Sequence, residues 1–126
     1  MVKLLQTVSL IFTILRIIIL NLIKQKCIKE TEIDPIIVDN AVENNFIDDP
    51  KLKFFFKCVM IAQKLLDENG NVHLEKYRKA CEYEGRDCGY VDKCQQIRGE
   101  TIEDTALRLY LSLNVWLSMY TLIVLN

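Results

Sequence analysis

The sequence predicts an all-α protein, a compact bundle of about six short helices held together by disulfides. Helix starts and stops recur along the chain, whereas the alternating polar and apolar runs that are typical of strands are scarce. Five cysteines in 126 residues favour an oxidising compartment, where disulfides stabilise small domains. The length indicates one domain, and a hydrophobic content of 51% is enough to form its core.

The first 20 residues are expected to form a secretory signal peptide (1–20), which leaves residues 21–126 as the helical domain. Lys3 gives a short basic start, and Leu4–Leu20 is mostly Leu, Ile, Val and Phe. Arg16 lies inside this run and no A-x-A-like cleavage site follows, so a membrane anchor is the alternative. A central arginine costs a membrane span about 2.5–3.5 kcal/mol, which favours the signal peptide.

Acidic residues and proline mark the helices of the first half of the domain. Asp48, Asp49 and Pro50 form a helix start, because an acidic cap precedes a proline in the first turn. The following run, Lys51–Leu66, has apolar residues near helical spacing and is predicted to be a helix. Upstream, Pro35–Phe46 has room for one further helix.

Three more helices are expected in the second half. Turn residues at 69–71 separate the helix predicted at Lys51–Leu66, called the aromatic helix for its three phenylalanines, from the next one, Val72–Tyr83. A short helix is predicted at Cys88–Ile97. A capping pair, Thr and Asp at 101 and 104, then begins a long helix from Ile102 to about Trp116.

The C-terminal segment 108–126 is unusually apolar and atypical of the rest of the domain. No charged residue occurs from Leu109 to Leu125. A run of this kind has to be buried, and we expect it to pack into the domain or to cover the mouth of a cavity. Its length is at the lower limit for a membrane span, which is the alternative.

Charge and motif content exclude several classes of function. Sixteen Lys and Arg against 17 Asp and Glu give a net charge of −1, which argues against nucleic acid as a partner. The single histidine, His73, follows a turn, and the gaps between Cys81, Cys88 and Cys94 do not match a zinc knuckle. The four glycines form no phosphate-binding loop. We therefore expect no enzyme, no metal and no cofactor.

Around the cysteines, the chain resembles the insect odorant-binding proteins of the pheromone-binding and general odorant-binding type. The resemblance runs from about Cys27 to Ser112, in the segments CIKET, DDPKLKFFFKC, LLDENGNVHLEKY, VDKCQQIRGE and EDTALRLYLS. The family pattern has six cysteines, and Cys58 and Cys94 fill the third and fourth places. Other places are filled differently, so the chain resembles the reduced-cysteine branch of the family.

The resemblance implies which disulfides are kept and which are lost. The family pairs its first cysteine with the third, the second with the fifth and the fourth with the sixth. It therefore implies a disulfide between Cys27 and Cys58. Phe54 and Glu103 stand at the second and fifth places, so one bridge is lost completely, and the Phe54 ring is expected to fill the space that it leaves.

Cys94 loses its family partner, because Ser112 stands at the sixth place. Cys81 and Cys88 are additional to the family pattern, and either of them is a candidate to pair with Cys94. Five is an odd number, so at least one thiol is free or pairs between chains. Buried, reduced cysteines in a cytosolic protein are the alternative.

The resemblance further implies a secreted, extracellular carrier that holds a small hydrophobic molecule, such as an odorant, a pheromone or a fatty derivative, in an internal apolar cavity. It also implies a chemosensory receptor as a further partner. Tyr77 is the best candidate for a polar group that orients the ligand. The candidate wall residues lie on three predicted helices: Phe55, Val59, Met60, Ala62, Leu74, Tyr77, Leu109, Leu113 and Trp116.

Two other classes of function remain open from the sequence. A membrane-anchored helical interaction protein would use the apolar N- and C-terminal segments, and only in that case is a membrane the partner. A cysteine-dependent enzyme would need a reactive thiol with a low pKa.

Overall fold

The computed structural model describes the backbone of residues 2–43 and 45–125 and the side chains of residues 3–4, 6–43 and 45–113. These residues form helices and no named strand, which confirms the predicted all-α class. The helices are α1 (Val2–Thr31), α2 (Pro35–Val42), α3 (Pro50–Ala62), α4 (Glu75–Tyr83), α5 (Gly89–Gln95) and α6 (Ile102–Leu125). Two of the helices are long: α1 has 30 residues, and α6, which begins where the long helix from Ile102 is predicted, has 24.

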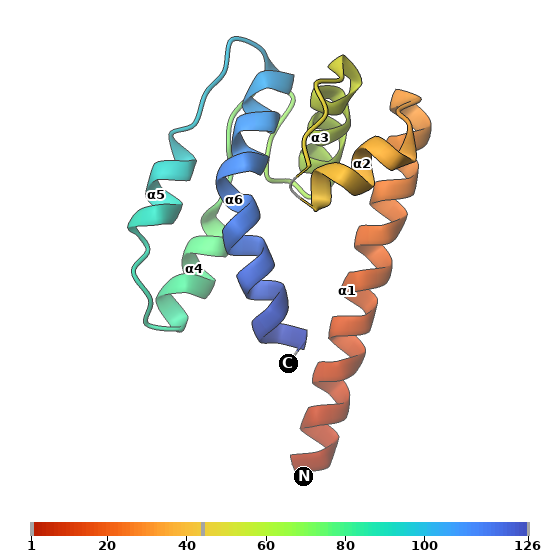
Figure 1. The fold of residues 1–126 in the computed structure, drawn as a ribbon. Coiled ribbons are helices and arrows are strands. Elements are labelled where there is room, and N and C mark those ends of the chain that lie inside the picture. The colour runs from red at the N-terminus through yellow and green to blue at the C-terminus, as the bar shows by residue number, and fades with distance from the viewer. Residues whose placement is uncertain (1, 44, 126) are drawn as a thin grey trace.

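Helix α3 lies at the centre of the fold. It packs against α6 on one side and against α1 on the other. Helices α4 and α5 lie beyond α6, on the side away from α1, and α2 crosses near the C-terminal end of α1 (Figure 1). Because α3 contacts both long helices, it directs one face towards α1 and another towards α6.

Local capping explains where α2 and α3 begin. The Asp34 carboxylate accepts a hydrogen bond from the backbone N–H of Ile36 at 2.9 Å, and Asp49 accepts one from Lys51 at 2.8 Å. A proline follows each acidic cap and occupies the first helical turn. The predicted start of the aromatic helix at Asp49 and Pro50 is therefore confirmed.

Helix α3 ends at Ala62, one turn earlier than the sequence predicts. Lys64 has a positive φ of 61°, and Leu66 pairs with Val72 in an antiparallel bridge. The Asp67 carboxylate holds the intervening turn by accepting the backbone N–H groups of Asn69 and Asn71, each at 2.9 Å. The helix stops because this side chain offers the backbone an alternative set of hydrogen bonds.

The connection between α5 and α6 depends on a close backbone approach. A Cβ atom at Gly99 would lie 2.6 Å from the Cβ atom of Asp104, so a glycine is required there. The Gly99 backbone N–H donates to the Thr105 hydroxyl at 2.8 Å, and the N–H of Asp104 donates to the Thr101 hydroxyl at 3.1 Å. The predicted capping pair at residues 101 and 104 thus begins α6.

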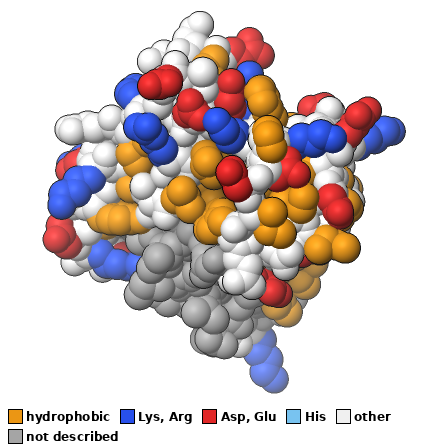
Figure 2. All heavy atoms as spheres, turned by 45° about the horizontal axis from the view of Figure 1, so that its top comes forward, with side chains coloured by type: hydrophobic (Ala, Val, Ile, Leu, Met, Phe, Trp, Pro, Cys, Tyr) orange, Lys and Arg blue, Asp and Glu red, His pale blue; other side chains and the backbone are white. Residues whose placement is uncertain are grey.

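The surface of the described part mixes charged and apolar side chains. Figure 2 shows acidic and basic groups interspersed around hydrophobic side chains, with no broad region of one charge on this face. The N-terminal part of α1 differs, because its large apolar side chains are mostly exposed along the run from Leu4 to Leu22. Within the described residues, Gln6–Thr31 is long and apolar enough to cross a membrane by length and composition, and a signal sequence at this position meets the same criterion.

Candidate functional site

Most of the predicted wall residues meet in one hydrophobic cluster between α3, the 65–74 connection and α6. Its fully buried members include Phe55, Met60, Leu74, Leu109 and Leu113. Two more of the predicted residues are partly buried and pack against the cluster, namely Val59 and Tyr77. The structure therefore brings together side chains that are more than 50 positions apart in the sequence.

Two of the predicted wall residues lie elsewhere. Ala62 is exposed and lines a groove on the outer side of α3, because it lies four residues after Cys58 and shares the face of α3 that is bonded to α1. Trp116 lies outside the side chains that the structure describes.

An aromatic group that the wall prediction omits extends the cluster. Phe56 is 2% exposed and stacks on Tyr110 with their ring centroids 3.9 Å apart. Phe55 meets Phe56 edge to face, and Phe46 meets Tyr110 in the same way. Burial raises the pKa of the Tyr110 hydroxyl, because the charged phenolate is poorly solvated there. The run of three phenylalanines at 54–56 could have indicated Phe56, because the buried face of a helix is wide enough for two adjacent large residues.

Phe54 does not fill the space of the lost family disulfide, contrary to the expectation. It is 47% exposed, and it lies four residues before Cys58 on the face of α3 that is directed towards α1. Lys53 and Asp104, which are the sequence neighbours of Phe54 and Glu103, form an ion pair of 2.9 Å between α3 and α6. This hydrogen bond raises the pKa of Lys53 and lowers the pKa of Asp104. An ion pair, and not the Phe54 ring, connects the two helices here.

Cys27 is bonded to Cys58, the pair that the resemblance implied, with Cα atoms 5.7 Å apart. This bridge ties the C-terminal end of α1 to the middle of α3. A hydrogen-bonded ion pair between Lys24 and Asp39, at 2.8 Å, connects the same end of α1 to α2. The last turns of α1 are therefore part of the domain, whereas its N-terminal part is not enclosed by it.

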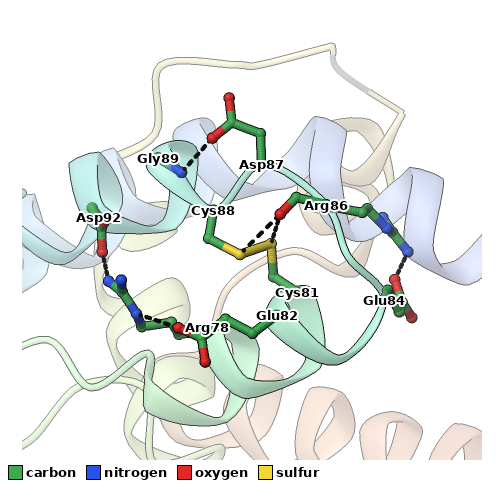
Figure 3. Close-up of a disulfide and its surroundings, with 9 residues drawn as sticks. All are labelled: Arg78, Cys81, Glu82, Glu84, Arg86, Asp87, Cys88, Gly89 and Asp92. Atoms are coloured by element: carbon green, nitrogen blue, oxygen red, sulfur yellow. Dashed lines mark hydrogen bonds and ion pairs between the residues drawn. A yellow bond between two sulfur atoms is a disulfide. The ribbon is translucent and has the colours of Figure 1, made fainter.

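The second bridge differs from the expectation that Cys94 pairs with Cys81 or Cys88. Cys81 and Cys88 are bonded to each other, with Cα atoms 5.9 Å apart, and they close the α4–α5 connection (Figure 3). The Arg86 carbonyl oxygen lies against both sulfur atoms, and Arg78 pairs with Asp92 across the same connection. The approach of α4 and α5 brings Cys81 and Cys88 together, which leaves Cys94 as a free thiol in the core.

The free thiol of Cys94 lacks the exposure and the lowered pKa of a reactive nucleophile. Cys94 is buried in α5, and burial raises the pKa of its thiol. The thiol therefore stays protonated at neutral pH and packs as a small apolar side chain.

Gln95 is a site-supporting residue that the sequence analysis missed. Its side-chain oxygen accepts the backbone N–H of Leu74 at 3.0 Å, and its amide nitrogen donates to the carbonyl oxygen of Val72. These bonds hold the 72–74 segment against α5, and thereby fix the position of the Leu74 side chain in the cluster. The partners are more than 20 positions apart, so no local pattern indicates them.

His73 and Asp67 form an exposed pair whose titration can be measured. His73 Nε2 lies 2.9 Å from an Asp67 carboxylate oxygen, and this hydrogen bond raises the pKa of His73 and lowers the pKa of Asp67. The raised pKa of His73 stabilises the turn below pH 6.5, and this stabilisation is lost as the pH rises through the folded-state value. The lowered pKa of Asp67 stabilises it above pH 3.8, and this is lost on acidification.

We therefore expect a pKa above 6.5 for His73 in an NMR titration, because protonation strengthens the bond to Asp67. The Asp67→Asn variant should lower the His73 pKa, although the Glu75 carboxylate, 3.8 Å from Nδ1, still raises it. A value at or below 6.5 in the unmodified protein would show that the two side chains are not paired in solution.

A surface groove of about 510 Å3 lies between the C-terminal turns of α1 and the outer face of α3. Two of its lining residues, Cys58 and Ile61, also pack against the edge of the buried cluster. Its lining comes from both helices: Lys26, Glu30, Thr31, Lys51, Phe54, Lys57, Cys58, Ile61 and Ala62.

Together, these features define a small all-helical protein in which disulfides join neighbouring helices around an apolar interior without an activated nucleophile among the described cysteines. A family model, described as the PBP/GOBP family, matches residues 19–111 of the chain. The chain belongs to the PBP/GOBP family. No curated protein and no solved structure matched it in the two further comparisons. Membership of this family implies an odorant-binding or pheromone-binding carrier and not an enzyme.

Proposed function

We propose that the protein is a secreted carrier that binds an odorant, a pheromone or a fatty derivative in its apolar interior, between α3 and α6. The observation that carries the proposal is the family match over residues 19–111. The buried cluster supports it, because seven of the nine predicted wall residues pack within or against one core. The ligand would separate α3 from α6 and replace part of their apolar contact. Its binding would gain about 25 cal/mol for each Å2 of ligand apolar area removed from water.

The wall chemistry suits an uncharged, largely apolar ligand with one polar group. Aliphatic and aromatic side chains form the cluster, and Met60 adds a side chain that adapts to different shapes. Tyr77, partly buried at its edge, is the proposed polar group that orients an alcohol or a carbonyl. Tyr110, whose ring stacks on Phe56, carries the second hydroxyl proposed as a polar group for the ligand.

Displacement of a fluorescent apolar probe, N-phenyl-1-naphthylamine, from the secreted protein tests the proposal. Decan-1-ol should displace the probe, with a micromolar dissociation constant. A protein that is folded and disulfide-bonded but does not bind the probe would contradict the carrier function.

The Tyr77→Phe variant tests the role of the hydroxyl. We expect it to bind decan-1-ol about two- to thirteenfold more weakly, since one hydrogen bond contributes about 0.5–1.5 kcal/mol. Binding of the apolar probe should be unchanged, because the ring is retained. Equal loss for both molecules would mean that the substitution disturbs the core and that Tyr77 does not orient the ligand.

We propose that export removes the N-terminal segment 1–20, and that the mature chain keeps the last turns of α1. The described apolar side chains before Leu22 support this, because most of them are exposed, whereas Lys24 and Cys27 have partners in the domain. Intact-mass measurement of the protein from the culture medium should give a chain that begins near Asn21. Recovery of the chain with Met1 in the membrane fraction would favour the anchored interaction protein instead.

A further inference from the structure

The groove between α1 and α3 is a second candidate binding site, on the face of α3 directed towards α1, whereas the wall residues proposed for the interior site contact α6. Its volume of about 510 Å3 lies in the range of small-molecule sites, about 300–1,000 Å3. Every residue that lines it follows position 25, so the groove remains after removal of residues 1–20. The Cys27–Cys58 bridge holds its two walls together.

The floor of the groove is apolar. Phe54, Cys58 and Ile61 follow one another at helical spacing along a single face of α3, and Ala62 continues that face. Phe54 is 47% exposed, so a large apolar residue is in contact with water at the groove. An acyl chain that covers this ring and its neighbours removes that area from water.

The rim of the groove is basic. Three lysines line it, Lys26, Lys51 and Lys57, against one carboxylate, Glu30, which leaves an excess of two positive charges. Glu30 is already 3.8 Å from the Lys26 ammonium. Lys57 has no ion-pair partner among the residues that the structure describes. The overall charge of the protein is −1, so this basic rim is a local feature.

We propose that the groove binds a single-chain amphiphile with an anionic head, a fatty carboxylate, independently of the ligand in the interior. The acyl chain lies on the floor formed by Phe54 and Ile61. The carboxylate pairs with Lys57 and Lys51 at the rim. Charge complementarity selects this occupant, because an uncharged ligand of the same length gains only the contact with the floor.

Titration of the secreted protein with decanoate, below its micelle concentration, tests the proposal by NMR of the backbone amides. We expect decanoate to shift the amide signals of Phe54, Lys57 and Ile61. The double variant Lys51→Glu and Lys57→Glu should bind decanoate at this site at least about tenfold more weakly. Its matched control is Lys76→Glu with Lys79→Glu, an equal change of charge on exposed residues of α4, which should bind within about twofold of the unmodified protein.

Three results would overturn the proposal. The first is an equal loss of affinity in both double variants, which would indicate a general charge effect. The second is decan-1-ol shifting the same amides with the same affinity, which would remove the role of the lysines. The third is decanoate shifting only amides of the buried cluster, such as Leu109.

Anionic phospholipid is the other source of the same chemistry, and sedimentation with phosphatidylglycerol vesicles distinguishes it. We expect the mature chain to stay in the supernatant while it binds monomeric decanoate. Sedimentation with the vesicles, without any response of the groove amides to decanoate, would assign the basic rim to a membrane surface and refute the carrier site.

Discussion

Truncation of Phe56 to alanine should lower the free energy of unfolding by about 3–5 kcal/mol, the largest effect that we expect from a single substitution. The Phe56 ring is 2% exposed, stacks on Tyr110 and meets Phe55 edge to face. Its removal leaves a cavity between α3 and α6, and the aromatic contacts are lost as well. Urea unfolding of the mature protein, followed by circular dichroism, gives the measurement.

Phe54→Ala is the matched control, because it makes the same chemical change two positions away on the same helix. We expect it to cost less than about 1 kcal/mol, since Phe54 is 47% exposed and faces the groove. If the Phe54 substitution were as costly as the Phe56 substitution, the orientation of α3 between α1 and α6 would be wrong.

Removal of the Cys27–Cys58 bridge should lower the free energy of unfolding by about 3.7 kcal/mol in the chain-entropy model. The bridge closes a loop with a sequence separation of 31, so its loss gives the unfolded chain much additional freedom. The double variant Cys27→Ser and Cys58→Ser removes it without leaving a free thiol from the pair. Urea unfolding under non-reducing conditions measures the change.

The second bridge provides the internal comparison. Cys81 and Cys88 are separated by only 7 positions, and the same model gives about 2.4 kcal/mol for their double serine variant. The order of the two costs is the prediction. A larger loss for the Cys81 and Cys88 variant would mean that the α4–α5 connection, and not the link between α1 and α3, limits the stability of the fold.

The elements that the sequence predicts well are those that depend on neighbouring residues. Asp49 caps α3 and is followed by Pro50, and the Thr101 hydroxyl accepts the N–H of Asp104 at the start of α6. Both arrangements are complete within four residues, so the local pattern determines them. The early end of α3 was missed because the 51–66 run keeps its helical spacing, while the Asp67 side chain organises the competing turn.

The errors at the candidate site come from contacts between distant segments. Periodicity places Phe54 and Ala62 on a helix, but it does not say that Cys58 bonds this face of α3 to α1. Once that bond is known, both residues have to lie on the outer side, because they are four positions from Cys58. The pairing of Cys81 with Cys88 depends in the same way on how α4 and α5 approach each other.

The most direct test of the carrier function is to locate a bound uncharged ligand in the mature protein. Protein methyl groups are labelled with carbon-13, and intermolecular NOEs to decan-1-ol are measured. Such NOEs report ligand hydrogens within about 5 Å of a methyl group, close to the contact distance of apolar side chains. We expect NOEs to the methyl groups of Met60, Leu74 and Leu109. NOEs confined to Ile61 and Ala62, or none at saturating ligand, would show that the interior is a solid core and that the chain does not enclose its ligand there.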